Sequence, residues 1–455
     1  MIFFTIPSII MSVNDSFLVP FFMKEGDNMQ PTDKHYQDYI QILREELVPA
    51  MGCTEPIAIA YGAAKAREVL GSVPERVLVE ASGNIIKNVK SVVVPNTGGL
   101  HGIEASAAAG IVAGKADLML EVISQVTDEE KDAIRDYMAN HKIEVRPAEG
   151  DIVFDIILTL WAGEDSVKLR ISDFHTNIVH IEKNGEVLME AGHSCAETPT
   201  EALTDRAFMS VEGILEFVET MNVDDVREMV ERQINYNYAI AEEGIRNDWG
   251  ANIGSVLLKH NGEDVATCAR AMAAAGSDAR MSGCEMPVII ASGSGNQGIT
   301  ASVPVIVYAK ALGVDHDTMV RAVTLSDLLT IHLKTGIGRL SAYCGAASAG
   351  CASGAAIAWL HGGGYAEIAH TLVNALATIS GMVCDGAKPS CAAKIALAVE
   401  TGLLGYHMYQ DGQQFYDGDG IVTKGVENTI RNVGRLGHTG MRETDKEIIR
   451  IMTGL

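Results

Sequence analysis

The stretch IVFDIILTLWAGEDSVKLRISDFHTNIVHIEKNGEVLMEAG, residues 152–192, decides the fold class of this 455-residue chain. Short runs rich in Ile, Val and Leu alternate with polar residues, which is typical of β-strands. The Asn-Gly pair at 184–185 predicts a tight turn that pairs the last two runs. We therefore expect several strands here, the last two of them paired through this turn.

The sequence before this stretch mixes strand and helix patterns. RVLVEAS at 76–82 and IIKNVKSVVVP at 85–95 read as strands, whereas residues 102–114 and 128–141 read as helices. Together with the first stretch they predict an α/β insert domain over residues 73–198, which is an ordinary domain size.

The rest of the chain reads as helices joined by Gly-rich turns. We expect residues 199–455 to form a large all-helical domain that the helices of residues 29–72 join, and residues 1–28 to be a disordered or spurious extension. The predicted fold class is therefore α+β and multidomain, with an α/β insert near the N-terminus.

Composition excludes several classes of function. With 35 basic and 59 acidic residues the net charge is −24, so nucleic acid and anionic membranes would be repelled. The apolar first segment lacks the basic start of a signal peptide and an uncharged run long enough to span a bilayer. We expect a cytoplasmic globular protein with reduced thiols, and the abundance of Ala and Gly makes a homodimer plausible.

Three of the eight cysteines form a pattern that suits a metal. Cys344 lies in a run of small residues, and Cys384 and Cys391 are separated by Gly386 and Pro389, which break a helix and would let the two thiols converge. Three sulfur ligands leave a metal one open position, which suits a Lewis acid that binds a leaving group. Burial as small core residues is the alternative.

Cys53, in PAMGCTEPIAIA, lies where a second helix begins, with Thr54 as the expected N-cap. A helix N-terminus lowers the pKa of a thiol, so Cys53 could be a general base, a nucleophile or a further metal ligand, or else a buried structural cysteine.

The segment Gly293 to Gly298 matches G-x-G-x-x-G by letter. A dinucleotide site is excluded because two helices, and no second strand with an acidic end, follow the segment. The loop is suited instead to holding a carboxylate or another small anion on its backbone N–H groups, with a plain turn as the alternative.

Five segments in one order resemble the L-cysteine desulfidase family, which is related to the iron–sulfur L-serine dehydratase alpha chain. They are MGCTEPIAIAYGAA (51–64), SGSGNQGITASVPV (292–305), LSAYCGAASAGC (340–351), GMVCDGAKPSCAAKIA (381–396) and VGRLGHTGMRETD (433–445). The resemblance runs from about residue 33 to the end of the chain.

The resemblance implies a lyase that contains a [4Fe-4S] cluster, uses no pyridoxal phosphate, and converts L-cysteine to pyruvate, ammonia and sulfide. By the same resemblance, Cys344, Cys384 and Cys391 are the three cluster ligands, and Cys53 is an additional cysteine at the active site. The serine dehydratases are similar but carry His-Thr where this chain has Cys53-Thr54, which favours cysteine over serine as the substrate.

The remaining site predictions concern proton transfer and substrate binding. The base is Cys53 first, with Lys334, His438 and His332 as alternatives. We expect the following groups to bind the substrate: Thr54, Ser82, Asn84, the loop at 96–102, Ser294, Asn296 and Gln297, with Arg339 and Lys388 as charge partners. Two further functions stay open, namely a dehydratase of L-serine or another β-substituted amino acid, and a non-catalytic metal or redox sensor.

Overall fold

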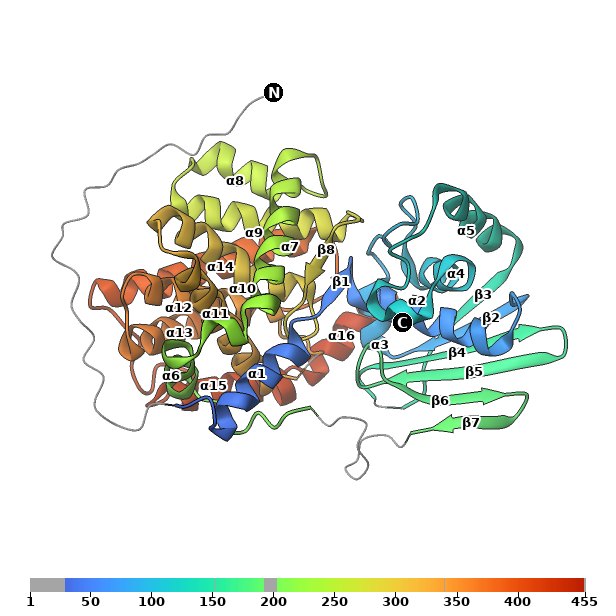
Figure 1. The fold of residues 1–455 in the computed structure, drawn as a ribbon, viewed down its shortest axis with the longest axis horizontal. Helices are drawn as coiled ribbons and strands as arrows, with labels where there is room; N and C mark the ends of the chain where they lie inside the picture. Colours follow the sequence, from blue (N-terminus) through green and yellow to red (C-terminus); the bar gives the residue numbers. More distant parts are fainter. Residues whose placement is uncertain (1–28, 151, 192–202, 339, 454–455) are drawn as a thin grey trace.

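The computed structural model describes residues 29–150, 152–191, 203–338 and 340–453. Figure 1 shows an α/β unit built on one sheet beside a larger unit of helices, which confirms the predicted α+β fold class. The extension predicted at 1–28 lies outside the described residues.

The sheet of the α/β unit has the strand order β3-β2-β4-β5-β6-β7. Its strands are β2 (Arg76–Ala81), β3 (Lys142–Pro147), β4 (Asp155–Ala162), β5 (Asp165–Ser172), β6 (Ile178–Lys183) and β7 (Glu186–Glu190). Strands β4 to β7 lie where the sequence predicts strands and form an antiparallel meander, and the predicted pairing of the last two is confirmed. Asn184 and Gly185 both have positive φ, as a type I′ turn requires.

Helices cover one face of this sheet (Figure 1). They are α2 (Thr54–Leu70), α3 (Gly83–Val89), α4 (Gly102–Ala113), the 3₁₀ helix η1 (Ala116–Glu121) and α5 (Asp128–Asn140). Helix α2 packs on β4 and β5, and a Cβ atom on its Gly62 would lie 2.6 Å from the side chain of Leu158. The contacts of α2 are thus with the α/β unit, whereas the sequence grouped residues 29–72 with the helical unit.

The strand predicted at residues 85–95 is wrong in its first half, where α3 forms instead. Ser82 caps this helix by accepting the backbone N–H of Ile85, and the buried side chains of Ile85 and Val89 are spaced four residues apart on one face. Capping and helical spacing therefore outweigh the β-propensity of the apolar run.

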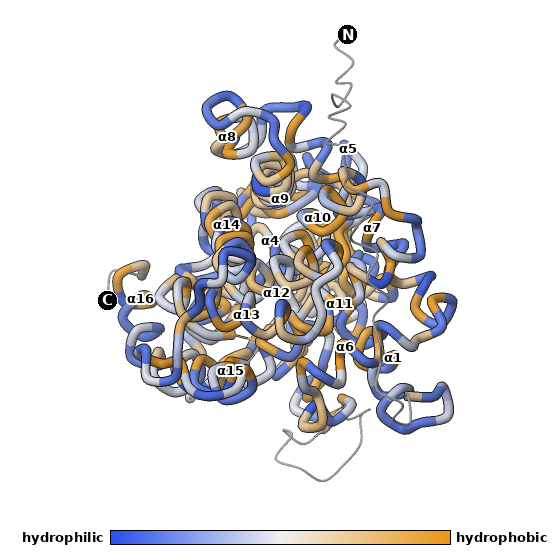
Figure 2. The backbone as a smooth tube through the Cα atoms, turned by 90° about the vertical axis from the view of Figure 1, so that its left-hand side faces the viewer, coloured by the Kyte–Doolittle hydropathy of each residue, from blue (hydrophilic) through white to orange (hydrophobic). Residues whose placement is uncertain are grey.

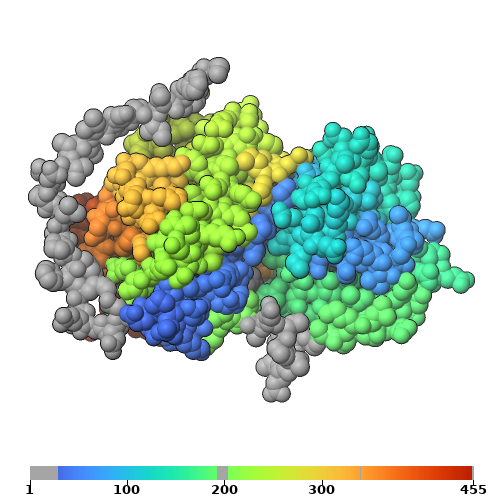
Figure 3. All heavy atoms as spheres, viewed as in Figure 1, coloured from blue at the N-terminus to red at the C-terminus, as the bar shows by residue number. Residues whose placement is uncertain are grey.

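The helical unit surrounds α12, which contacts α10, α11, α13 and α14 (Figure 2). Its helices are α1 (Lys34–Glu46), α6 (Val211–Thr220), η2 (Val223–Asp225), α7 (Arg227–Arg246), α8 (Ile253–Asn261), α9 (Val265–Met281), α10 (Gly295–Leu312), α11 (His316–Thr335), α12 (Gly345–Leu360), α13 (Tyr365–Ile379), α14 (Ser390–Gln410), α15 (Val426–Arg435), η3 (Leu436–Gly440) and α16 (Arg442–Thr453). Figure 3 shows α1 lying along the surface of this unit. Within the described ranges, none of the helices has the length and hydrophobicity that crossing a membrane requires.

One short strand lies before Cys53 and another before Ser294, and the two strands pair with each other. Strand β1 (Pro49–Met51) pairs antiparallel with β8 (Pro287–Ile289) in a sheet of their own. Helices follow β8, as predicted, and a Cβ atom on Gly298 of α10 would lie 2.1 Å from the carbonyl oxygen of Ile289. The glycine at this position therefore allows close packing of α10 on β8.

Helices α12 and α14 run parallel with their backbones almost in contact. A Cβ atom on Gly350 would lie 2.4 Å from the carbonyl of Ala398, and one on Gly402 would lie 2.1 Å from the carbonyl oxygen of Gly350. Residues further along α12 contact residues further along α14, so the two helices run in the same direction. This register places the N-terminal ends of α12 and α14 beside each other.

We predict that Gly402→Ala destabilises the protein by about 1–3 kcal/mol, because the added methyl group overpacks the contact between α12 and α14. The matched control is Gly381→Ala, since a Cβ atom there meets nothing within 4 Å and the backbone does not have positive φ. Thermal unfolding measures both variants. Equal melting temperatures for the two variants would contradict the close helix contact.

Candidate active site

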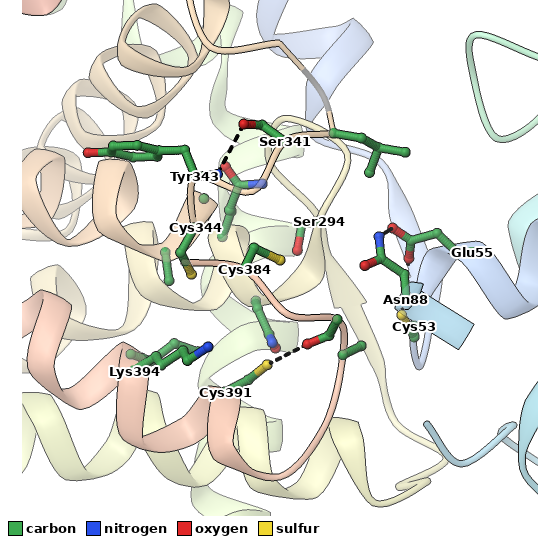
Figure 4. Close-up of a pocket in the computed structure, with 18 of the residues that line it drawn as sticks. Cys53, Glu55, Asn88, Ser294, Ser341, Tyr343, Cys344, Cys384, Cys391 and Lys394 are labelled. Carbon is green, nitrogen blue, oxygen red and sulfur yellow. Dashed lines mark hydrogen bonds between the residues drawn. The ribbon is translucent and has the colours of Figure 1, made fainter. Parts of the chain in front are cut away.

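A cavity with about 740 Å³ of empty space, including its open mouth, lies between the α/β unit and the helical unit. Cys53, Glu55 and Asn88 line it from the α/β unit, and residues that begin or follow helices α9 to α14 line it from the other side. Figure 4 shows these two groups of side chains facing each other.

A short antiparallel bridge brings Cys344 and Cys384 together. Tyr343 pairs with Val383, the N–H of Cys344 donates to Met382, and the N–H of Cys384 donates to the carbonyl of Ala342 at 2.6 Å. Two residues that flank a bridged pair project on the same face of the ribbon. Both side chains accordingly point to the cavity (Figure 4).

The third cysteine reaches the same cavity through helix register. Cys344 is the N-cap of α12, and Cys391 is in the first turn of the parallel helix α14. Gly386 has φ +92°, and a Cβ atom there would lie 2.2 Å from the carbonyl oxygen of Lys87, so the connecting loop packs on α3. The predicted broken helix is wrong, since Cys384 lies in the extended bridge before α14 begins.

Each of the three thiols lines the cavity, and none is in a disulfide. Burial, together with Cys384 and Cys391, raises the pKa of Cys344 to about 12. Burial also raises the pKa of Cys391. Burial therefore favours the uncharged form of Cys344 and Cys391 in the cavity as it stands.

Within the part of the chain that the structure describes, no three His, Cys, Asp or Glu side chains are placed to hold one metal ion. Cysteine thiolates are the ligands of iron–sulfur clusters and also bind zinc. The three free thiols that line the cavity therefore have the donor chemistry of an iron–sulfur site.

Four helices begin at this cavity. Cys53, Ser294 and Cys344 are the N-caps of α2, α10 and α12, and Cys391 is in the first turn of α14. Helix N-termini carry partial positive charge and unpaired N–H groups. The cavity is therefore suited to anions, although the chain as a whole has a net charge of −24.

Cys53 differs from its prediction in two ways. It is itself the N-cap of α2, so Thr54 is the first helical residue and its hydroxyl donates instead to the carbonyl oxygen of Gly293 at 3.1 Å. Burial, followed by the charge of Glu55, raises the pKa of Cys53 well above its ordinary value. The helix dipole contributes only about 0.3–1 kcal/mol, less than one pKa unit, so burial outweighs it.

Glu55 is the acceptor at the centre of a buried network that sequence reasoning missed. Its carboxylate accepts the thiol of Cys53 at 3.1 Å, the hydroxyl of Thr54 at 3.2 Å and the amide of Asn88 at 2.9 Å. Burial would raise the pKa of Glu55, but the charge of His175, the hydrogen bond from Cys53, a backbone hydrogen bond and the charge of Arg280 together lower it. Its position in the motif Cys-Thr-Glu-Pro was the available signal.

The structure brings only part of the predicted substrate-binding set together. Ser294, Asn296 and Gln297 line the cavity. Ser82 instead caps α3 and donates to the carbonyl of Val153 at 2.8 Å, and neither it nor Asn84, Thr54 or the loop at 96–102 is among the residues that line the cavity.

Of the predicted bases, Cys53 and Lys334 line the cavity. His438 is exposed in the π-helix η3, and His332 pairs with Glu427 at 2.8 Å, so neither lines the cavity.

Of the two predicted charge partners, Arg339 lies outside the described residues, and Lys388 pairs with Asp385 at 2.5 Å. The cavity has three other cations that the sequence did not indicate. They are Lys87, Arg280 and Lys394.

The C-terminal helix α16 connects the helical unit to α3 near this cavity (Figure 1). Lys87 of α3, whose side chain is 1% exposed, forms an ion pair with Asp445 of α16 at 2.5 Å. Ile449 of α16 also packs against Gly83 at the start of α3. A buried charge and an apolar contact thus hold the two units together beside the site.

The fold and the site define a class of α+β protein with a cysteine-lined cavity between a mixed sheet and a helical unit. A family model described as "Serine dehydratase alpha chain" matches residues 117–450. The chain belongs to this family. The match includes Cys344, Cys384 and Cys391, whereas Cys53 and Glu55 precede it.

Similar full-length relatives carry the name UPF0597 protein. One from Desulfitobacterium hafniense is 62% identical over 93% of this chain and 98% of its own length. A second from Treponema denticola is 46% identical over 92% of this chain and 98% of its own length. A third from Bacteroides fragilis is 36% identical over 93% of this chain and 99% of its own length. The aligned lengths therefore include residues from both sides of the cavity.

We predict that Asp445→Asn lowers stability by about 3–5 kcal/mol, because the buried ammonium of Lys87 loses its only carboxylate partner among the described ion pairs. Adding Lys87→Met to Asp445→Asn should restore much of the loss, since no unpaired charge then remains. Glu443→Gln, in the exposed pair with Lys446, is the matched control and should leave the melting temperature unchanged. Strictly additive effects of the two buried substitutions would argue against the pairing.

Proposed function

We propose that the chain is a lyase that cleaves L-cysteine to pyruvate, ammonia and hydrogen sulfide, with a [4Fe-4S] cluster held by Cys344, Cys384 and Cys391. The observation that carries the proposal is the presence of three free thiols around one open cavity in a member of the serine dehydratase alpha chain family. Such a cluster, when bound, would supply a Lewis-acidic iron for the departing sulfur.

The chain's own residues support binding of such a group. Three thiols from α12, the extended bridge and α14 surround the space, and the N-termini of α12 and α14 favour the negative charge of cysteine thiolates. Lys394 lies beside them, and the charges of Cys344 and Cys391 contribute to its raised pKa, although burial opposes this and Asp385 is the larger raising cause. Cys53 donates instead to Glu55, which leaves three ligands for the cluster.

The elimination needs a base for the Cα proton. As that C–H bond breaks, its electron pair forms the Cα=Cβ bond, the Cβ–S bond breaks, and the sulfur leaves as sulfide. The resulting aminoacrylate takes up water and releases ammonia and pyruvate. Cys53 and Lys334 are the predicted bases that line the cavity. Because the thiol of Cys53 donates to Glu55, Cys53 acts as the base only after passing its own proton to that carboxylate, and its Sγ then accepts the Cα proton.

L-Serine is the second candidate substrate, since the family that the chain belongs to is named for serine dehydratase. Loss of water in place of sulfide would use the same base and the same binding groups. Cys53-Thr54 in place of His-Thr favours cysteine. Comparing sulfide release from L-cysteine with pyruvate release from both amino acids decides between them.

We predict about four irons and four acid-labile sulfides per chain after anaerobic purification, with sulfide and pyruvate released from L-cysteine. Cys344→Ala, Cys384→Ala and Cys391→Ala should each lose the cluster and the turnover, because each removes a ligand. Cys351→Ala is the matched control. Cys351 is fully buried in α12 and does not line the cavity, so this variant should keep both iron and activity.

Two results would contradict the proposal. Protein that stays free of iron after anaerobic reconstitution would return the three cysteines to a structural role. A cluster that survives the substitutions would show that other residues bind it. An intact cluster without turnover on either amino acid would support the non-catalytic sensor instead.

A further inference from the structure

We infer that the cavity recognises a free α-amino acid as its zwitterion, with Arg280 binding the carboxylate and Glu55 binding the ammonium group. This inference rests on the proposed function for the reaction that follows binding, and it names the residues that select the substrate class. It accounts for polar groups in the cavity that the cysteines leave unexplained.

Arg280, in the last turn of α9, is a buried cation that faces the cavity and is only 2% exposed. One of its N–H groups donates to Asn296 Oδ1 at 3.1 Å, while its Nε has no hydrogen-bond partner among the described residues. None of the described ion pairs includes it. A guanidinium is always charged and offers five donors in a fork that matches a carboxylate. Its charge helps to lower the pKa of Glu55, but the two are not among the described ion pairs, so a ligand carboxylate would supply the close anion that a buried guanidinium needs.

The N-terminus of α10 lies directly against this guanidinium. A Cβ atom on Gly295 would lie 2.4 Å from Arg280 Nε, so only a glycine lets the side chain pass. Ser294, the N-cap of α10, also lines the cavity. The free N–H groups of a helix start and a forked cation therefore converge at one place, which is the combination that binds a carboxylate.

The acceptors lie in the same cavity. Glu55 is a buried carboxylate that lines it from α2, with Asn88 beside it (Figure 4). Asn88 donates to Glu55 through its Nδ2, which leaves its Oδ1 without a partner, and Gln297 Oε1 is also without one in the described structure. An ammonium group has three N–H donors and no acceptor. Three acceptors in one cavity match it, and a hydroxyl group in its place would leave two of them unpaired.

The test measures binding without turnover, using L-alanine, which has both charged groups but no leaving group. Isothermal titration calorimetry is run on the anaerobically purified full chain, with propionate and ethylamine as probes that each lack one charge. We expect either probe to displace L-alanine only at concentrations about 30-fold higher or more, since truncating one buried charge pair costs at least that factor.

The variants assign each charge to a residue. Arg280→Met should weaken the binding of L-alanine about 30-fold or more and leave the binding of ethylamine unchanged. Glu55→Gln should weaken the binding of L-alanine by a similar factor and leave the binding of propionate unchanged. Arg246→Met removes an arginine on the protein surface, with a 66% exposed side chain, and should change nothing. Arg280→Met should still bind ethylamine and Glu55→Gln should still bind propionate, and this retained binding shows that each variant is folded. Arg280→Lys should fall between the wild type and Arg280→Met, because it keeps the charge and loses the fork.

Equal affinity for L-alanine and for either probe would overturn the inference, as would unchanged L-alanine binding in Arg280→Met. The possible outcomes distinguish failure of this inference from failure of the proposed function. Arg280-dependent binding of L-alanine without release of sulfide or pyruvate keeps the inference and removes the reaction. Turnover of L-cysteine with an unchanged KM in Arg280→Met keeps the reaction and removes the inference.

Discussion

The backbone contact between α12 and α14 is the constraint on which the site depends. Gly350 and Gly402 let the two parallel helices approach until a single methyl group would not fit. Because the helices are parallel and in register, their N-termini lie side by side, and each N-terminus carries a cysteine. A bulkier contact would separate Cys344 from Cys391 and widen the space between them. The high content of Ala and Gly thus has a direct structural purpose.

The second feature of the site is its local charge. The chain is strongly acidic, yet Lys87, Arg280, Lys334 and Lys394 line the cavity, and Glu55 is its buried carboxylate. Four helix N-termini add to the same positive field. Such a field favours a substrate carboxylate inside a protein whose surface repels other anions. The position of the cavity between the two units also makes the Lys87–Asp445 ion pair part of the site's support.

The sequence predicted what local patterns determine. Alternation predicted the strands β4 to β7 and the Asn-Gly turn predicted the pairing of the last two, and small residues around Cys344 indicated a backbone that others can approach. The assignment of the three cysteines as cluster ligands stays a prediction, supported by their convergence on one cavity.

Helix α3 was missed because its cap, Ser82, was interpreted as a substrate-binding residue. The pKa of Cys53 was predicted in the wrong direction because burial depends on tertiary packing, which no helix-start motif reports. Arg280 and Glu55 were missed for the same reason, since they are more than 200 positions apart and meet only across the cavity.

Anomalous diffraction at the iron absorption edge, from crystals of the anaerobically purified chain, tests the central claim most directly. The account predicts iron density inside the cavity, in contact with Cys344, Cys384 and Cys391 and with no fourth protein ligand. Iron bound elsewhere in the chain, or a cluster closed by a fourth protein ligand, would contradict it.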